Sequence, residues 1–331
     1  MSDKRKLDHI NLAFKSVPKT QTDLFSSYYE PILSAHPEED FCKTNFLKNS
    51  FGMPLWVSSM TGGTEKALII NQNLARACNQ FQLGMGLGSC RPLLESSSRF
   101  DDFNMRPYIG DALLFTNFGI AQVEQLLDEG NLNKIFEITN LLKANGVVIH
   151  VNPLQEWAQE EGDKFKYPPI DTIKKVVEKS KFPIIVKEVG QGFGPLSIRE
   201  LLKLPLAAIE LAGYGGTNFT LLEQARLNGS NSVDSSSKSK FGNIGHSAAQ
   251  MIDWINQCVK EGKTECSEII ISGGIKDAVT AQVLMNSLEL NSVVGMASEL
   301  LKYSMKDYSS LEKYLVGLKG DFNLSKAFIR G

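Results

Sequence analysis

A cluster of polar side chains follows directly on a short apolar run near the middle of the chain. Residues 150–156 are His-Val-Asn-Pro-Leu-Gln-Glu, and they come after the run Gly146-Val-Val-Ile149. Because proline cannot donate to a β-ladder, a strand over the apolar run must stop near Pro153. The side chains that could then project into one mouth are His150, Asn152, Gln155 and Glu156. By itself the segment is more typical of an ordinary loop, and a single histidine is more often structural than catalytic.

The composition argues against several classes of protein. The 331-residue chain carries a net charge of −2 at pH 7 and has no basic stripe, so we expect no nucleic-acid partner. No apolar run approaches the ~20 residues that a membrane span needs, and the first residues lack the apolar core of a signal peptide. We therefore expect a cytoplasmic protein without a membrane partner. At this length the chain could form two modest domains or one large barrel.

The cysteines indicate neither a disulfide framework nor a zinc site. Their number is odd, they are scattered, and none forms a CxxC pair. They are Cys42, Cys78, Cys90, Cys258 and Cys266. The sequence predicts reduced thiols at all of these positions.

Short β-rich runs recur along the chain, and segments with helical spacing separate several of them. The eight runs are residues 55–58, 83–87, 112–116, 147–149, 184–187, 208–211, 269–271 and 292–294. The helical segments include residues 122–127, 171–177, 197–202 and 278–287. Strands and helices that alternate at this spacing predict a parallel sheet. Eight such units in one chain favour a (β/α)8 barrel, the TIM-barrel fold, over an open doubly wound sheet.

Two segments lie outside this repeat. Residues 1–50 come before the first predicted strand and form an N-terminal extension, so we expect the barrel to occupy residues 51–331. Residues 227–243 form a long stretch rich in Ser, Gly and Asn between strands six and seven. This stretch could be a surface loop or a lid that orders over substrate at the catalytic face, and the sequence favours neither.

Glycine-bearing turns follow four of the predicted strands. They are residues 59–64, 213–217, 272–275 and 295–298. Glycine lets backbone N–H groups approach an anion closely, and the ends of strands seven and eight are the usual phosphate site of a barrel. Three such turns at successive strand ends in the second half of the chain indicate a phosphorylated cofactor or substrate. The alternative is that they only make tight turns.

In order and spacing, these motifs resemble those of type 2 isopentenyl-diphosphate isomerase along nearly the whole chain. The two specific motifs are HxNPxQE at residues 150–156 and RKxxH at residues 5–9. The other matching segments are residues 59–63, 88–91, 117–119, 161–163, 186–190, 215–217, 272–275 and 295–297. The glycine turns are shared with many FMN-dependent barrels. The resemblance implies an FMN-dependent barrel enzyme that interconverts isopentenyl and dimethylallyl diphosphate.

The resemblance also implies how substrate is held. Moving a carbon–carbon double bond beside a diphosphate requires both anion binding and proton transfer. The residues implied at the substrate are Arg5, Lys6, His9, Ser89, Cys90, Arg91, Asn152 and Gln155. Mg2+ held by Glu156 would neutralise further phosphate charge, since Mg2+ often takes one carboxylate and completes its shell with water and substrate oxygens. Without the resemblance, Arg5 and Lys6 would be interpreted as a solvated basic tail.

For the cofactor, the resemblance implies FMN in its reduced form, with NADPH or NADH as the reductant. The residues implied at the ring system are Met60, Thr61, Gly62, Ser89 and Asn117. Those implied at the ribityl phosphate are Thr217, Gly273, Gly274, Ala297 and Ser298. Taken singly, each of these is more often a cap or turn residue than a ligand.

The implied catalytic residues are Gln155, Lys187 and His150. A glutamine cannot act as a simple general base, so the reduced flavin would be the acid–base agent, and Gln155 would position substrate or relay a proton. Lys187 would stabilise the anionic edge of reduced FMN, because a lysine that ends an apolar strand is costly unless it is paired with an anion. His150 could bind diphosphate, orient Asn152, or be structural.

Three positions depart from the family pattern. Cys90 stands where Gln is usual, Ala212 stands where Ser is common, and residues 243–247 replace a different stretch. If Cys90 were exposed in the site, it would make the protein sensitive to thiol reagents. His246, in the altered stretch, is a candidate phosphate contact or a plain loop histidine.

Two other functions stay open at this point. A 2-hydroxyacid oxidase on an FMN barrel would need a base, normally His, near strand seven, and the residues after Ile275 offer Lys276 and Asp277 but no His. A non-catalytic flavin-binding barrel would have no reason to keep HxNPxQE together with Lys187. The resemblance also implies a homo-oligomer, a tetramer or octamer, in which the RKxxH motif could reach a neighbouring subunit's site.

Overall fold

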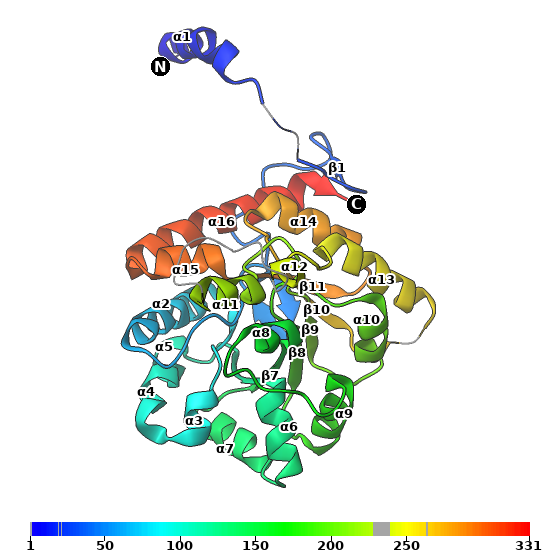
Figure 1. Cartoon of the computed structure of the whole chain (residues 1–331). Coiled ribbons are helices and arrows are strands. Elements are labelled where there is room, and N and C mark those ends of the chain that lie inside the picture. Colours follow the sequence, from blue (N-terminus) through cyan, green and yellow to red (C-terminus); the bar gives the residue numbers. More distant parts are fainter. Residues whose placement is uncertain (1, 19, 21, 228–238, 263) are drawn as a thin grey trace.

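Eight parallel strands close into a barrel in the computed structural model, which describes residues 2–18, 20, 22–227, 239–262 and 264–331 (Figure 1). The barrel strands are β4 (Leu55–Val57), β5 (Gly84–Gly86), β6 (Leu114–Gly119), β7 (Gly146–Val151), β8 (Ile184–Glu188), β9 (Ala208–Glu210), β10 (Glu268–Ser272) and β11 (Asn291–Met296). They pair in chain order, and the ring closes where Gly295 of β11 lies opposite Trp56 of β4. The predicted (β/α)8 barrel is confirmed, since each predicted run overlaps one of these strands.

Helices follow the strands and cover the outside of the barrel (Figure 1). Those after the first four barrel strands are α2 (Glu65–Phe81), α3 (Arg91–Glu95), α4 (Phe100–Phe103), α5 (Arg106–Ile109), α6 (Ile120–Asp128), α7 (Asn133–Leu141), α8 (Pro153–Ala158) and α9 (Pro169–Lys179). Those after the last four are α10 (Pro195–Leu202), α11 (Phe219–Leu227), α12 (Ser239–Gly242), α13 (Ala248–Lys260), α14 (Ala278–Ser287), α15 (Ser298–Ser304) and α16 (Tyr308–Phe328). The four predicted helices coincide with α6, α9, α10 and α14.

Side-chain caps start several of these helices. Thr64 accepts a hydrogen bond from the backbone N–H of Ala67 at α2, and Asp277 accepts one from Thr280 at α14. Ser247 forms a reciprocal capping box at the start of α13. Each cap satisfies backbone N–H groups that a helix start otherwise leaves unpaired. The caps therefore determine where the helices begin relative to the strand ends, and so where the loops of the mouth lie.

Apolar side chains fill the N-terminal half of the barrel interior. β2 (Thr44–Phe46) and β3 (Asn49–Phe51) form an antiparallel hairpin at the N-terminal ends of the strands. Phe46 packs edge to face against Phe51 and Trp56, with ring centroids 5.8 and 6.5 Å apart. The other interior side chains are Leu113, Phe115, Val148, Ile185, Ala208, Ile270 and Val293. The hairpin spans the expected boundary at residue 50, and the packed interior leaves the C-terminal ends of the strands for chemistry.

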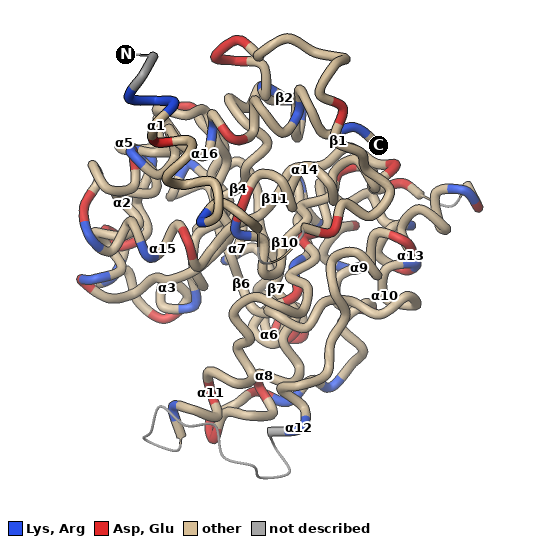
Figure 2. The backbone as a smooth tube through the Cα atoms, turned by 90° about the horizontal axis from the view of Figure 1, so that it is seen from above, with Lys and Arg blue, Asp and Glu red and all other residues tan. Residues whose placement is uncertain are grey.

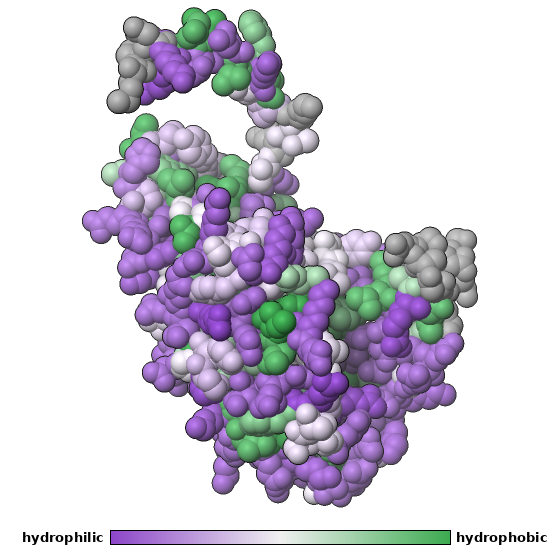
Figure 3. All heavy atoms as spheres, turned by 90° about the vertical axis from the view of Figure 1, so that its left-hand side faces the viewer, coloured by the Kyte–Doolittle hydropathy of each residue, from purple (hydrophilic) through white to green (hydrophobic). Residues whose placement is uncertain are grey.

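The first residues of the chain stand clear of the barrel. α1 (Ser2–Leu12) and the 3-10 helix η1 (Ala13–Lys15) lie beyond α16 in Figure 1, and Figure 3 shows them arching over open space. Further along, β1 (Tyr28–Tyr29) pairs antiparallel with β12 (Ile329–Arg330), which ties the extension to the C-terminus. Five apolar side chains are exposed on this segment: Leu7, Ile10, Leu12, Phe14 and Val17.

The surface carries charges of both signs. Figure 2 shows Lys and Arg interspersed with Asp and Glu, with α8, α11 and α12 gathered at one end of the molecule and β2 at the opposite end. Within the described ranges, no helix combines the length and apolarity needed to cross a membrane. The five cysteines are free, as the sequence predicts, and all of them are buried.

Three details differ from the sequence-based expectation or lie outside the structure. β6 starts two residues later than predicted and runs through Asn117, whose Nδ2 is satisfied by the carbonyl of Leu87 at 3.0 Å. Residues 153–158 form helix α8 instead of a loop, because proline suits a first helical turn whose N–H groups have no intrahelical partner. Residues 228–238 of the predicted loop or lid lie outside the described residues.

Candidate active site

A buried ion pair lies at the C-terminal ends of β8 and β9. Nζ of Lys187 donates to Oε1 of Glu210 at 2.7 Å, and Glu210 is 0% exposed. Oγ of Ser58 donates to the same Oε1 at 2.6 Å, whereas Oε2 of Glu210 is buried without a hydrogen-bond partner in the described part of the chain. A buried charge is tolerated only when it is paired. The sequence predicts an anion beside Lys187, and the carboxylate of Glu210 supplies part of that negative charge.

Sequence reasoning missed Glu210 and found its partner. The signal was available, because Glu210 is an acidic residue inside the apolar run of residues 208–211, just before a glycine turn. β8 and β9 are neighbours in register, with Lys187 opposite Glu210. An acidic and a basic residue at the ends of adjacent parallel strands meet at the same mouth. The pairing of strands was needed to see this.

His150 pairs with Asn117 across β6 and β7. Since Nδ2 of Asn117 donates to Leu87, its Oδ1 accepts from Nδ1 of His150 at 2.8 Å. Burial, and then the nearby Lys187 cation, lowers the pKa of His150 to about 4. The imidazole is therefore neutral at pH 7, with Nε2 left as the acceptor. The expectation that His150 orients Asn152 is wrong, because Asn117 is its partner.

The segment after β7 holds an orienting network. Nδ2 of Asn152 donates to Oε1 of Glu156 at 2.9 Å and to Oε1 of Gln155 at 3.2 Å. Oε2 of Glu156 accepts from the backbone N–H of Asp163 at 2.9 Å. Glu156 and Asn152 are buried, and Oδ1 of Asn152 has no hydrogen-bond partner within the described residues. The network holds the Glu156 carboxylate in one orientation and leaves one lone pair on each oxygen for a further ligand.

Asp163 links this network to Arg91. Nη1 of Arg91 lies 3.3 Å from Oδ2 of Asp163, and Nε2 of Gln122 donates to the same oxygen at 2.9 Å. The Arg91 side chain is half exposed, so it can exchange Asp163 for an arriving anion at modest cost. Asp163 and Gln122 were not singled out as site residues from the sequence. The structure thus brings Arg91 and Glu156 together through residues that only the fold places there.

Cys90 does not face a ligand. Its side chain is 0% exposed, its Sγ donates to the carbonyl of Gly88, and burial raises the pKa of its thiol to about 12. The expectation that its side chain contacts substrate is therefore wrong, and so is the concern about thiol sensitivity, since the reactive thiolate is strongly disfavoured. Ser89 beside it is partly buried, and its Oγ lies 3.5 Å from the backbone nitrogen of Arg91.

The glycine turns converge on one small cavity of about 70 Å3 at the mouth. The expected phosphate-end residues Thr217, Gly273, Gly274, Ala297 and Ser298 all line it, together with Lys187. Gly273 and Gly274 have φ of +117° and +74°, and a Cβ at either position would collide with the backbone of the turn at residues 213–215. Only glycine fits there. The cavity has room for a phosphate-sized group enclosed by backbone.

The residues expected at a flavin ring lie around the ends of β4, β5 and β6. Met60, Thr61 and Gly62 follow β4 and are partly buried. A Cβ on Gly88 would collide with the Thr61 carbonyl, so the turns after β4 and β5 are in close contact. Oγ of Ser59 is buried and has no hydrogen-bond partner among the described residues. Asn117 completes this side of the mouth from β6.

The structure does not bring the N-terminal motif to this mouth. Arg5, Lys6 and His9 are exposed on α1, and no hydrogen bond or ion pair in the described part of the chain joins α1 to the barrel. α1 lies beyond α16, whereas the mouth is marked by α8 and α11 (Figures 1 and 2). His246 also lies apart, since it lines a different hollow beside α10. Within one chain, these side chains do not contribute to the site.

No group of three or more His, Cys, Asp or Glu side chains that could hold a metal occurs within the residues that the structure describes. Glu156 therefore belongs to no such group among the described residues, and its orientation is set by Asn152 and the backbone of Asp163. Such a residue suits an ion that is shared with a substrate phosphate better than an ion enclosed by protein alone.

A closed parallel barrel with charged groups and glycine turns at its C-terminal mouth defines a (β/α)8-barrel enzyme. Solved structures share the fold. The flavin-binding domain of baker's yeast flavocytochrome b2 has a TM-score of 0.61 at 12% identity, covering 91% of this chain and 72% of that one. A mandelate oxidase mutant has a TM-score of 0.58 at 11% identity, covering 92% and 84%. No protein-family model matches the chain.

Curated relatives identify the family. Isopentenyl-diphosphate delta-isomerases match this chain in Nostoc sp. (31% identity over 93% of this chain and 86% of the relative), Deinococcus radiodurans (32%, 94% and 89%) and Picrophilus torridus (30%, 98% and 91%). The chain therefore belongs to the isopentenyl-diphosphate delta-isomerase family and is an isomerase. The resemblance drawn from the sequence is confirmed, and the closed barrel agrees with the type 2 form.

Proposed function

We propose that this protein interconverts isopentenyl and dimethylallyl diphosphate without net redox change, using reduced FMN at the barrel mouth and Mg2+ on the diphosphate. The observation that carries the proposal is the convergence of Lys187 and the glycine turns on one cavity. A cation and a backbone cradle at the same mouth suit a phosphorylated cofactor with an anionic reduced form. Membership of the isomerase family supplies the substrate and the reaction.

The residues present fit FMN. The cradle at Gly273 and Gly274 excludes any Cβ, and buried polar atoms of Ser59 and Glu210 lack partners in the described structure. The phosphate would be held by Thr217, Gly273, Gly274, Ala297 and Ser298, and the ring by Met60, Thr61, Gly62, Ser89 and Asn117. When bound in its reduced form, FMN supplies the acid–base group for the alkene, and NADPH or NADH supplies only its reduction.

Lys187 provides positive charge at the mouth. Glu210 and Ser58 hold its surroundings in place through hydrogen bonds of 2.7 and 2.6 Å. Because the pair is buried, electrostatic interactions around it are strong, and its side chains need little reorganisation during the reaction. Lys187 would thereby stabilise negative charge on reduced FMN bound at the mouth.

The segment after β7 positions the substrate. Asn152 orients both Gln155 and Glu156, so the Nε2 donor of Gln155 has a defined direction. Glu156 has lone pairs left for Mg2+ shared with the diphosphate. His150 is neutral, and its Nε2 can accept a hydrogen bond but brings no positive charge to the diphosphate. Arg91 adds a guanidinium that can bind phosphate oxygens in a bidentate manner.

The N-terminal motif would act on a neighbouring subunit. Arg5, Lys6 and His9 stand clear of their own barrel, and the same segment exposes Leu7, Ile10, Phe14 and Val17. Apolar side chains that are exposed together on one segment are expected to be covered by another surface. A homo-oligomer, a tetramer or octamer, would cover these side chains and bring the basic residues to a second copy's mouth.

The test is anaerobic conversion of isopentenyl diphosphate with FMN, Mg2+ and NADPH, with dimethylallyl diphosphate and NADPH measured together. We expect many product molecules per NADPH consumed. Lys187→Ala should lower kcat about 100-fold or more, on the scale of losing one preorganised charge-stabilising group. The matched control is Lys203→Ala, which removes an exposed lysine that pairs with Glu200 and should leave kcat unchanged.

Two results would contradict the proposal. NADPH consumption in step with product would favour an oxidoreductase that resembles 2-hydroxyacid oxidases. The mandelate oxidase mutant with which this chain shares its fold is the reason to consider that alternative. Bound FMN without any product would favour a non-catalytic flavin-binding barrel.

A further inference from the structure

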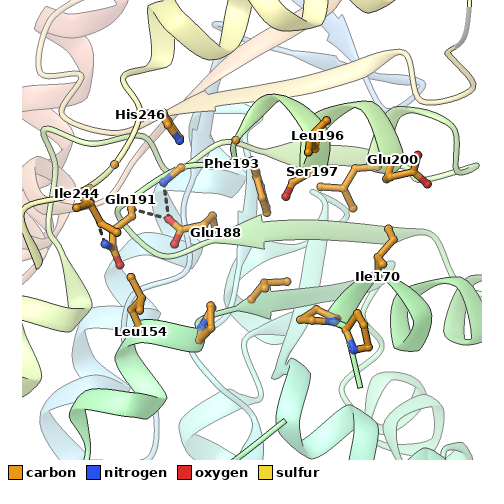
Figure 4. A pocket seen from close by; sticks show the side chains of 18 of the residues that line it. Leu154, Ile170, Glu188, Gln191, Phe193, Leu196, Ser197, Glu200, Ile244 and His246 are labelled. Atoms are coloured by element: carbon orange, nitrogen blue, oxygen red, sulfur yellow. Dashed lines mark hydrogen bonds between the residues drawn. The ribbon is translucent and has the colours of Figure 1, made fainter. Parts of the chain in front are cut away.

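A second hollow lies on the flank of the barrel beside the mouth. It has a volume of about 900 Å3 and lies between the segment after β7, the start of α9, the helix α10 and residues 243–246 (Figure 4). None of its lining residues lines the glycine-turn cavity. Its size is in the range of pockets that hold small organic molecules, which is roughly 300–1,000 Å3. The proposed reaction leaves this space unused.

The walls of the hollow are mainly aliphatic and aromatic. Side chains that contribute apolar surface include Leu154, Ile170, Ile173, Phe193, Leu196 and Ile244. Ile173 and Phe193 are buried at 2% and 7% exposure, so the hollow reaches into the core instead of ending at the surface. Leu196 and Ile244 are exposed at its rim. An occupant would remove this apolar surface from water, which is favourable by about 25 cal/mol per Å2.

The charged groups of the hollow already have partners. Oε2 of Glu188 accepts from the backbone N–H groups of Gly190, Gln191 and Gly192 at 2.6–2.7 Å. Glu200 pairs with Lys203 at 2.5 Å and with Lys174 at 3.5 Å. Among the residues that the structure describes, neither lysine lines the hollow, nor does an arginine. Two carboxylates, with no lysine or arginine among the described lining residues, disfavour a phosphate or carboxylate ligand.

Two polar side chains remain available to an occupant. Oγ of Ser197 and the ring nitrogens of His246 make no hydrogen bond within the described part of the chain, and Figure 4 shows both side chains at the hollow. His246 packs edge to face on Trp254, with ring centroids 5.0 Å apart, so its ring is held in place. One hydroxyl group on a ligand could be bound by either side chain.

We propose that this hollow binds an uncharged apolar molecule with one hydroxyl group, of the class of medium-chain alcohols. The apolar walls take the chain, and either Ser197, which is exposed at the rim, or the partly buried His246 binds the hydroxyl group. Pro153 and Leu154 in the wall directly precede Gln155 and Glu156, and Glu188 directly follows Lys187. An occupant therefore contacts the backbone that carries the catalytic side chains and changes the rate of isomerisation. That last consequence rests on the proposed function, whereas the binding itself does not.

Gly194 offers a way to fill the hollow. It lines the wall with φ of −74°, which any residue adopts, and a Cβ there would meet only Nε2 of His246 at 3.6 Å. Gly194→Trp therefore places an indole in the hollow without backbone strain. Gly192 and Gly245 also line it, but their φ of +73° and +159° make substitution there unsuitable. The matched control is Gly317→Trp, on the exposed side of α16, where nothing lies within 4 Å of an added Cβ.

The experiment uses the full chain and the uncharged fluorescent probe N-phenyl-1-naphthylamine. We expect saturable binding to the wild type and to Gly317→Trp, with at least tenfold weaker binding to Gly194→Trp. Dodecanol should displace the probe, and dodecyl phosphate should not. Thermal unfolding verifies that all three proteins are folded. Equal binding to Gly194→Trp, or displacement by both competitors alike, would overturn the proposal.

Two further readouts separate the possible failures. Saturating dodecanol should change the isomerisation rate of the wild type at least twofold and leave that of Gly194→Trp unaltered. If the protein has no isomerase activity at all, the proposed function fails while probe binding still decides the site. If instead no probe binds and Gly194→Trp alters the oligomeric state in size-exclusion chromatography, the hollow is an interface between copies and the ligand site is refuted.

Discussion

At the scale of single residues, the site contains charged and polar side chains that are buried or partly buried and paired with one another. Lys187 ends an apolar strand and is paired with a fully buried Glu210. His150 is held neutral by burial and oriented by Asn117. Such arrangements are costly for stability and are retained where charge and hydrogen-bond direction matter.

The lowered pKa of His150 predicts a pH-dependent stability. Its folded pKa is about 4 against 6.5 when unfolded, so below pH 6.5 the unfolded chain binds the proton first. The native state therefore loses stability as pH falls from about 6.5 to 4, by about 3 kcal/mol from this group. His150→Gln keeps an amide donor for Asn117 but has no titratable ring. Urea unfolding of both proteins at pH 7, 6 and 5 should show their free energies converging as pH falls, whereas parallel profiles would contradict this assignment.

At the scale of elements, the hairpin of β2 and β3 closes the barrel that the site sits on. Phe46 is 0% exposed and packs on Phe51 and Trp56, below the charged groups of the mouth. The hairpin comes from the segment that the sequence sets apart as an extension. The barrel interior is thus completed by residues from outside its own repeat, and the floor of the site depends on them.

Truncating Phe46 should therefore destabilise the whole barrel. Phe46→Ala removes a buried ring and leaves a cavity, with an expected loss of about 3–5 kcal/mol in the free energy of unfolding. Ser50→Ala, an exposed position in the same hairpin, should change it by less than about 0.5 kcal/mol. Chemical denaturation measures both. Similar small effects for the two variants would show that the hairpin is not part of the cooperative core.

At the scale of the whole molecule, one chain alone does not assemble the site that the sequence motifs imply. α1 carries the basic motif, it and the residues that follow it expose several apolar side chains, and this segment stands clear of the barrel (Figure 3). The mouth lies elsewhere, beside α8 and α11. A helix this short and exposed is marginal by itself and gains stability from a surface that covers it.

Subunit mixing tests this arrangement. Arg5→Ala and Lys187→Ala should each be nearly inactive in the isomerase assay, because one lacks the donated cation and the other the buried one. After the two proteins are mixed and allowed to exchange subunits, some mouths contain an intact Lys187 and an intact Arg5 from the neighbour. Activity should then appear that neither parent has. Unrescued activity, with exchange verified by mass, would place Arg5 outside the site.

The sequence alone determines much of this protein. Alternating strands and helices predict the barrel, because each unit buries its apolar face only by stacking in the same sheet. The glycine turns predict a phosphate-binding mouth, because glycine allows conformations and close approaches that other residues do not. Pro153 marks the end of the strand before the HxNPxQE segment, and the family resemblance implies the roles of that motif and of Lys187. These features depend on neighbours along the chain, and so they can be recognised without a structure.

Only the tertiary structure decides which of those residues meet. Glu210 joins Lys187 through the register of β8 and β9, Asp163 joins Arg91 to Glu156, and Cys90 turns into the core. Each of these contacts depends on side chains distant in sequence, whose relative positions follow from packing of the whole barrel. The RKxxH motif on α1 can likewise be recognised from neighbouring residues. Its position relative to the mouth, however, depends on the fold and on any second copy of the chain. Local chemistry is thus encoded in short segments, whereas the partners of each charge are selected by the way the barrel closes.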